Sequence, residues 1–136
     1  MEIGEIYFWT NTIKDWNKLL HHDEYKRIIM ESLKFLTQKK FVTIYSFVIM
    51  PNHMHLVWKI NEKNGKELPH ASFNKFTAHE ILNDLKVKKP NLLTLFKVEE
   101  PERKFRIWQR DPLAILMDSK KKVEQKVDFP SLRVTC

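Results

Sequence analysis

The chain alternates between apolar, strand-like runs and amphipathic stretches with helical spacing. Residues 5–13 are aromatic and β-branched, which predicts a first strand. Residues 41–50 are apolar at nearly every position, as expected for a central strand that is covered on both faces. Pro51-Asn52 then forms a turn, and residues 53–60 run back beside the preceding strand. This pattern predicts an antiparallel hairpin at the centre of a sheet.

Two stretches between the strands have the periodicity of helices. Asp23 can cap a helix over residues 23–40, in which the apolar positions form one stripe and lysines gather at the end. Ser72 can cap a second helix over residues 72–89, which also has one apolar face. Each helix is therefore expected to bury one side against a sheet.

The remaining elements define the fold class. Residues 103–110 are expected to form a fourth strand, and residues 119–129 resemble the start of a third helix that Pro130 stops. The resulting order is β-α-β-β-α-β plus a C-terminal helix. We therefore predict an α+β, ferredoxin-like (split βαβ) fold, with a four-stranded antiparallel sheet and helices on one face.

The composition excludes several classes of protein. A chain of 136 residues is most simply one domain, here residues 1–129 followed by an atypical tail over 130–136. Two glycines are too few for a Gly-rich phosphate loop, and the single cysteine, Cys136, excludes an internal disulfide framework. No apolar run approaches the roughly 20 residues of a membrane span, and the first residues lack a signal-peptide pattern. We expect a soluble, cytoplasmic protein with no membrane partner.

The charge points to polyanionic partners. Lysine and arginine number 24 against 17 acidic residues, which gives a net charge of +7 and a pI near 9.5. Such a balance favours nucleic acid as a partner, although an ordinary basic surface would have the same charge.

His53 and His55 are the first candidates for chemistry. Residues i and i+2 of a strand point to the same side, roughly 6.5–7 Å apart at Cα, so the two rings can converge on one cation. Neutral imidazoles suit borderline divalent metals, which would need a further oxygen or nitrogen ligand. The same spacing also fits two half-buried, hydrogen-bonded histidines with a purely structural role.

The residues around the histidines resemble a known signature. The block "VIMPNHMHLVW" at 48–58 is similar to that of the HUH-type tyrosine transposases of small insertion sequences, in particular the REP-associated tyrosine transposases. "FNKFTAHEIL" resembles the second helix of that family, "RIWQRD" its Trp-Gln-Arg strand, and "VEQKVDF" the helix before its catalytic tyrosine. The resemblance covers about residues 1 to 129.

The resemblance implies a function in DNA transposition and recombination. Members of the family cut and rejoin single-stranded DNA of mobile elements through a tyrosine nucleophile and a divalent cation, Mg or Mn, without a nucleotide cofactor. His53 and His55 match the metal ligands. The implied partner is hairpin or single-stranded DNA. Insertion-sequence relatives pair as homodimers, whereas the REP-associated branch can act as monomers.

The sequence departs from the family at its end. Phe129 stands where the family has the nucleophilic tyrosine, Pro130 follows it, and Arg133 stands where a polar metal ligand would be. A phenyl ring has no hydroxyl, and a guanidinium cannot ligate a metal. Tyr45, beside the histidine pair, is a weak substitute because a strand tyrosine usually packs, and Gln125 is an unsupported alternative ligand. We expect a protein that binds DNA but lacks the nucleophile for strand transfer.

Basic residues on two further elements are candidates for DNA contacts. On the expected strand 103–110, three cations and an indole alternate onto one face, which suits phosphates and a stacked base, although a tryptophan more often fills a core. The second helix carries a basic side, and residues 119–122 add charge that a solvated helix start would also have. The candidates are Lys75, His79, Lys86, Lys104, Arg106, Trp108, Arg110, Lys120 and Lys121.

Two other functions also fit parts of the pattern. A ferredoxin-like sheet can be an RNA-binding platform, but the RNP signatures are missing. A metal-dependent hydrolase could use His53 and His55 with a water nucleophile, but it would need at least a third ligand that the sequence does not identify.

Overall fold

The computed structural model describes residues 1–117 and Arg133–Val134. Its centre is an antiparallel sheet in the order β6-β1-β3-β2, extended by a short parallel strand, β7, beside β2. The third helix predicted over 119–129 lies outside the described residues. The strands of this sheet are β1 (Ile6–Thr12), β2 (Val42–Ile49), β3 (His53–Ile60), β6 (Leu113–Leu116) and β7 (Arg133–Val134).

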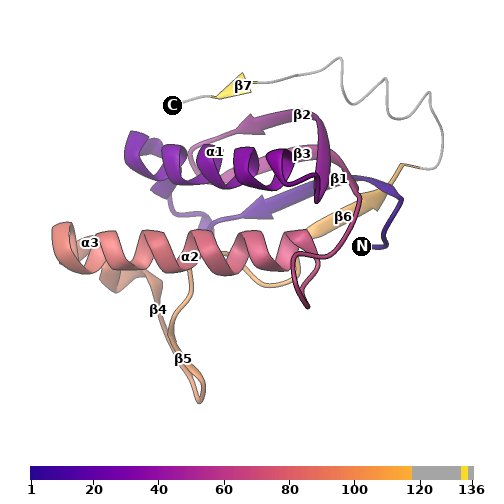
Figure 1. Ribbon diagram of the computed structural model, residues 1–136. Helices are drawn as coiled ribbons and strands as arrows, with labels where there is room; N and C mark the ends of the chain where they lie inside the picture. The colour runs from indigo at the N-terminus through magenta and orange to yellow at the C-terminus, as the bar shows by residue number, and fades with distance from the viewer. Residues whose placement is uncertain (118–132, 135–136) are drawn as a thin grey trace.

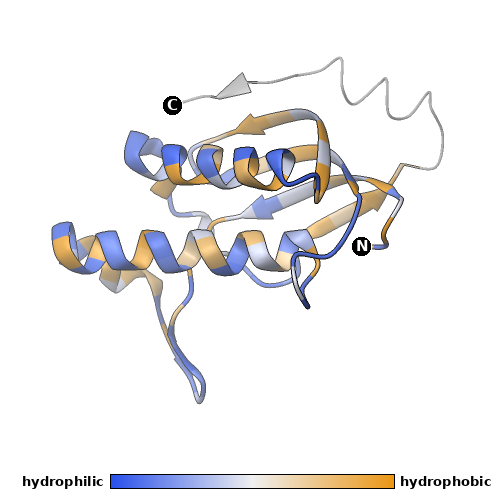
Figure 2. Ribbon diagram, viewed as in Figure 1, coloured by the Kyte–Doolittle hydropathy of each residue, from blue (hydrophilic) through white to orange (hydrophobic). Residues whose placement is uncertain are grey.

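Two long helices cover one face of the sheet. Figure 1 shows α1 (Asp23–Gln38) and α2 (Pro69–Lys88) side by side in front of the strands. Their apolar sides face the strands, whereas their outer sides are largely hydrophilic (Figure 2). The α+β class, the four antiparallel strands and the placement of helices on one face are confirmed.

The core lies between the helices and alternate residues of the central strands. Trp9 of β1 and Trp58 of β3 stack with ring centroids 4.9 Å apart, and Phe73 of α2 meets Trp9 edge-on at 5.9 Å. All three side chains are almost fully buried. Burying aromatic rings of this size supplies much of the hydrophobic driving force that holds helices on a sheet.

The fourth sheet strand is not the segment that the sequence predicts. Of the expected strand 103–110, only Arg103–Phe105 form a strand, β5, which joins β4 (Lys97–Glu100) in a separate hairpin. Trp108 makes an isolated antiparallel bridge with Ile13, just beyond the end of β1. The sheet strand is β6, ten residues later, which pairs with β1. Between β5 and β6 the chain crosses the end of β1, and Asp111 turns it at a φ of 56°. The prediction that residues 103–110 form the fourth strand is therefore wrong.

The second helix also begins earlier than predicted. Pro69 opens α2, because its fixed φ suits the first turn and its missing N–H needs no partner there. Ser72 lies inside the first turn, where its hydroxyl donates to the Pro69 carbonyl at 3.0 Å instead of capping the helix. The remaining short elements are α3 (Pro90–Leu93) and the 3-10 turns η1 (Lys14–Trp16), η2 (Leu19–His21) and η3 (Thr94–Phe96).

Candidate nucleic-acid interface

His53 and His55 lie together on the central strand β3. They occupy alternate positions on the side of the strand opposite the core residues Met54 and Leu56. Their ring centroids are 4.8 Å apart and the ring planes are nearly perpendicular, at 76°. The structure therefore brings the two predicted metal ligands within reach of a common ion.

Hydrogen bonds orient both rings. Nδ1 of His53 lies 2.7 Å from Oδ1 of Asn52, and Nδ1 of His55 lies 2.9 Å from Oγ1 of Thr10 on β1. Because an amide oxygen only accepts, the first bond puts the proton of His53 on Nδ1 and leaves Nε2 with its lone pair. A histidine that ligates a metal is usually held in this way by a second partner.

The electrostatics of His53 favour its neutral form. Partial burial lowers the pKa of this imidazole below its ordinary value of 6.5, because desolvation disfavours the cation. A neutral imidazole is the form that binds a metal ion. The burial of His53 therefore favours the protonation state that a ligating histidine has.

Two imidazoles fill only part of a coordination sphere. Within residues 1–117, no cluster of three or more histidine, cysteine, aspartate or glutamate side chains could hold a metal ion. The donors present fit two positions of a borderline divalent ion. Gln125, the alternative ligand, and Phe129, at the position of the expected nucleophile, lie outside the described residues, as do Lys120 and Lys121.

Tyr45 does not stand at the histidine pair. It occupies an irregularity of β2 at which the register with β3 shifts. The residue opposite His55 is Val48, three positions along the strand, or roughly 10 Å. Nothing in this placement directs the Tyr45 hydroxyl to the imidazoles.

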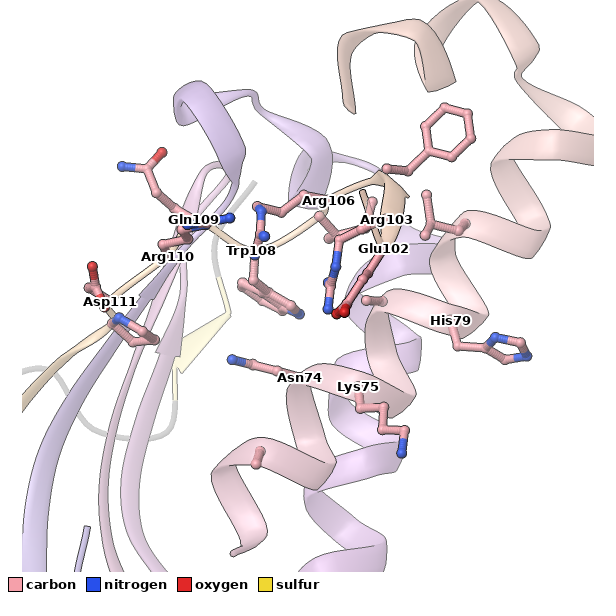
Figure 3. A pocket seen from close by; sticks show the side chains of 16 residues that line it. Asn74, Lys75, His79, Glu102, Arg103, Arg106, Trp108, Gln109, Arg110 and Asp111 are labelled. Atoms are coloured by element: carbon pink, nitrogen blue, oxygen red, sulfur yellow. The ribbon is translucent and has the colours of Figure 1, made fainter. Parts of the chain in front are cut away.

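A second feature is a groove between α2 and the segment 102–112, called here the α2 groove. It has a volume of about 760 Å³ and combines cations with a few apolar side chains. Figure 3 shows the labelled residues of α2 on one side and those of the 102–112 segment on the other. It is lined by Ala71, Asn74, Lys75, Ala78, His79, Leu82, Glu102, Arg103, Phe105, Arg106, Ile107, Trp108, Gln109, Arg110, Asp111 and Pro112.

Most of the predicted DNA-contacting residues meet at this groove. Five line it directly, although they come from elements far apart in the sequence: Lys75, His79, Arg106, Trp108 and Arg110. The ammonium of Lys86 lies 5.8 Å from the ring centre of Phe105, which is also part of the lining. Lys104 is exposed on β5 but does not line the groove.

Acidic residues already hold several of these cations. Glu100 accepts from Arg106 at 2.8 Å and also pairs with Arg110, while Lys75 lies 3.1 Å from Glu67. Burial raises the pKa of Glu100, but the hydrogen bonds from the two arginines outweigh this effect and hold the pKa below its ordinary range. Glu100 is therefore a carboxylate at neutral pH and pairs with both guanidinium groups.

Trp108 belongs to the core rather than to the open surface. Its side chain is 4% exposed, and Nε1 donates to Oγ1 of Thr77 on α2 at 2.9 Å. Its ring also packs against Phe73, with centroids 5.9 Å apart. The predicted alternation of three cations and an indole on one strand face does not occur, because the chain leaves the extended conformation after Phe105.

The structure adds residues that sequence reasoning missed. Arg103 and Gln109 line the groove, and Glu100 controls two of the arginines. The stretch "EEPERKFR" carried a signal for this arrangement, since a Pro101 turn between acidic and basic residues is typical of a charged hairpin.

The groove and the histidine pair are connected through one backbone bond. The N–H of Gln109 donates to the carbonyl of Thr12 at 2.8 Å. Thr12 is the residue of β1 directly opposite His53. Gln109, which lines the α2 groove, therefore lies beside the end of β1 that pairs with His53.

In the described part of the chain, no helix is both long enough and apolar enough to cross a lipid bilayer.

Comparisons with known proteins identify a related fold. No family model matches the sequence, and no curated protein matches it. Among solved structures, the fold is similar to a REP-associated tyrosine transposase that was solved bound to a REP hairpin. The TM-score is 0.61 at 16% sequence identity, over 94% of this chain and 65% of that chain. The likeness therefore shows a shared fold, and this chain spans 65% of the length of the structure it matches.

Proposed function

We propose that this protein is a DNA-binding member of the HUH-type tyrosine transposases, which holds hairpin or single-stranded DNA without performing strand transfer. The observation that carries the proposal is the short connection between the cationic α2 groove and the histidine pair, through Gln109 and Thr12. The solved transposase with a similar fold is bound to a DNA hairpin, which supports the same class of partner.

The cations of the groove supply the affinity in this proposal. Arg103 and Lys104 make no ion pair with any described residue, so they can meet a phosphate without losing an internal partner. Arg106 and Arg110 would exchange Glu100 for phosphate. Neutralised phosphates release counterions, so the affinity should fall steeply as salt is added.

The histidine pair supplies the position of one phosphate. A divalent cation held by His53 and His55 would neutralise phosphate oxygens and align the group. Asn52 and Thr10 fix the two rings through their Nδ1 atoms. Phe129 at the position of the expected tyrosine supports binding without cleavage, because it offers no hydroxyl to attack phosphorus.

Binding assays with labelled nucleic acids test the proposal. A hairpin with a single-stranded extension and an unstructured DNA strand should bind more tightly than blunt duplex and than RNA of the same length. Neutralising Lys86, Arg103 and Lys104 together, each to Gln, should weaken single-strand binding by roughly tenfold in low salt. It should also reduce the slope of log K against log salt concentration by about two, since each phosphate contact to single-stranded DNA contributes ~0.7 to that slope.

A matched variant separates a site from general charge. Lys34→Gln, Lys39→Gln and Lys63→Gln remove the same charge from exposed positions outside the α2 groove, and they should leave affinity within about twofold. Equal weakening by both triple variants, or equal binding of duplex, RNA and single strands, would reduce the proposal to non-specific attraction. A covalent DNA adduct formed with Mn²⁺ would refute the absence of strand transfer.

A further inference from the structure

One tryptophan is exposed, in contrast to the other three. The side chain of Trp16 is 59% exposed, whereas Trp9, Trp58 and Trp108 are at most 4% exposed. Large aromatic side chains are normally buried or placed at binding surfaces, so an indole left in water needs an explanation.

The backbone that presents Trp16 is strained. Asp15 and Trp16 both have positive φ angles, of 55° and 59°. Residues other than glycine seldom adopt this conformation, and two in succession persist only when the surroundings hold them. Strain of this kind concentrates at functional sites, where it keeps a side chain in a defined position.

Contacts from the groove segment hold this turn. The N–H of Asp15 donates to Oε1 of Gln109 at 3.0 Å, and the N–H of Lys14 donates to the Ile107 carbonyl at 2.8 Å. Nζ of Lys14 also donates to the Leu95 carbonyl at 3.2 Å. Residues that line the α2 groove therefore fix the turn that carries the indole.

The indole also stands beside the histidine pair. The ring centroids of Trp16 and His53 are 6.4 Å apart, and their planes meet at 65°. The turn at residues 14–17 thus touches both parts of the candidate interface. An aromatic surface in this position would contact a nucleic-acid strand that passes from the groove to the histidines.

We infer that Trp16 is a stacking platform for one unpaired base next to the phosphate at His53 and His55. This inference rests on the proposed function and adds a binding residue for single-stranded nucleic acid. Stacking on an indole accepts any base, because every base has a π-face, and a rigid platform loses little freedom on binding. The adjacent groove carries cations, including the exposed Arg110. These cations favour a nucleic-acid strand, which offers both bases and phosphates, over an apolar partner.

Tryptophan fluorescence tests the inference directly, since the spectrum of the wild type minus that of Trp16→Phe isolates Trp16. In the free protein, this difference spectrum should have the red-shifted emission of a solvated indole and be accessible to acrylamide. An unlabelled 12-nucleotide DNA strand should quench it and protect it from acrylamide, whereas blunt duplex should not.

Affinity provides the second readout. Anisotropy of a labelled 12-nucleotide strand should show that Trp16→Ala binds on the order of tenfold more weakly and that Trp16→Phe recovers most of the loss. The urea midpoints of both variants should match that of the wild type, because the exposed ring contributes little packing.

The outcomes distinguish the inference from the proposed function. If the wild type binds the strand but Trp16→Ala binds equally well and the difference spectrum does not respond, stacking is overturned and DNA binding stands. A blue-shifted, acrylamide-protected difference spectrum in the free protein would overturn it as well, by showing that the indole is covered. If the wild type binds no DNA in the anisotropy assay, the proposed function and the inference fail together.

Discussion

The histidine pair and the α2 groove are held in position by different kinds of interaction. Hydrogen bonds to Asn52 and Thr10 orient the imidazoles on a rigid central strand, and none of these bonds is to a charged group. In the groove, by contrast, ion pairs with Glu100 and Glu67 hold three of the cations. Under the proposed function, the first site would be preorganised for a metal ion, whereas Arg106, Arg110 and Lys75 would give up internal partners to bind phosphate. The two sites should therefore respond differently to mutation, salt and pH.

The largest expected effect is on metal binding at the preorganised site. His53→Ala and His55→Ala should each weaken Mn²⁺ binding on the order of 100-fold, because one imidazole cannot chelate. Asn52→Ala should cost about tenfold through the lost orientation of His53. Titration with Mn²⁺ followed by electron paramagnetic resonance measures all three.

The control for this experiment is a histidine elsewhere on the surface. His21→Ala removes an exposed imidazole whose ring lies 6.2 Å from that of His22, and it should leave Mn²⁺ affinity unchanged. If His21→Ala weakens binding as much as His53→Ala, the pair on β3 is not the metal site.

The second prediction concerns the packed wall of the groove. Trp108→Ala should lower the free energy of unfolding by about 3–5 kcal/mol, because it empties a buried position. Trp108→Phe should cost about 1–3 kcal/mol, since it leaves the buried acceptor Oγ1 of Thr77 without its donor. Urea denaturation gives both values. A change below about 0.5 kcal/mol, as for a surface residue, would show that Trp108 is not part of the core and would again favour base stacking as its role.

The placement of the two histidines could be predicted because its determinants are local. Strand alternation places His53 and His55 on one face, and the Pro51-Asn52 turn lies directly before them, so neighbouring residues fix the geometry. The central hairpin and α1 have strong periodicity, and their observed bounds differ from the predicted ones by two residues or fewer.

The groove could not be predicted in the same way because distant contacts determine it. The alternating pattern at 103–110 fits a strand, yet the N–H of Arg106 bonds to Phe96 outside the sheet. Bonds to Thr12 and Lys14 then hold residues 107–109 at the end of β1 as an isolated bridge instead of a continuous strand. Local patterns carry no information on such partners. Trp16 was missed for a similar reason, since its exposure depends on a turn held by Gln109, far along the chain.

The third prediction uses the internal competition in the groove. Glu100→Gln removes the carboxylate that holds Arg106 and Arg110, and it should strengthen single-strand DNA binding several-fold in low salt. Glu102→Gln changes the same charge on the groove without breaking an ion pair of a described residue, so it is the matched control. Equal gains in both variants would mean that only net charge matters and that Glu100 does not restrain the arginines.

The smallest effect should be on the pH dependence of stability. Burial lowers the pKa of His53 and of His70, and the charged N-terminus adds to the shift of His70. Between the lowered folded value and the ordinary value of 6.5, the unfolded chain binds more protons than the folded one. The free energy of unfolding should therefore rise with pH through this window and level off above it.

Urea midpoints between pH 5 and pH 8 measure how stability changes with pH. Two variants then separate the contributions of His70 and His53 to this change. His70→Leu should flatten it, because the Nδ1 atom of His70 is buried without a hydrogen-bond partner among the described residues and only the neutral ring tolerates this. His53→Asn should remove the part of the slope that comes from His53 and should weaken Mn²⁺ binding strongly. His70→Leu should leave Mn²⁺ binding intact. If the dependence of stability on pH persists in the double variant, other groups cause it and the pKa of His53 is not lowered. That result would remove one reason to regard the histidine pair as preorganised for a metal.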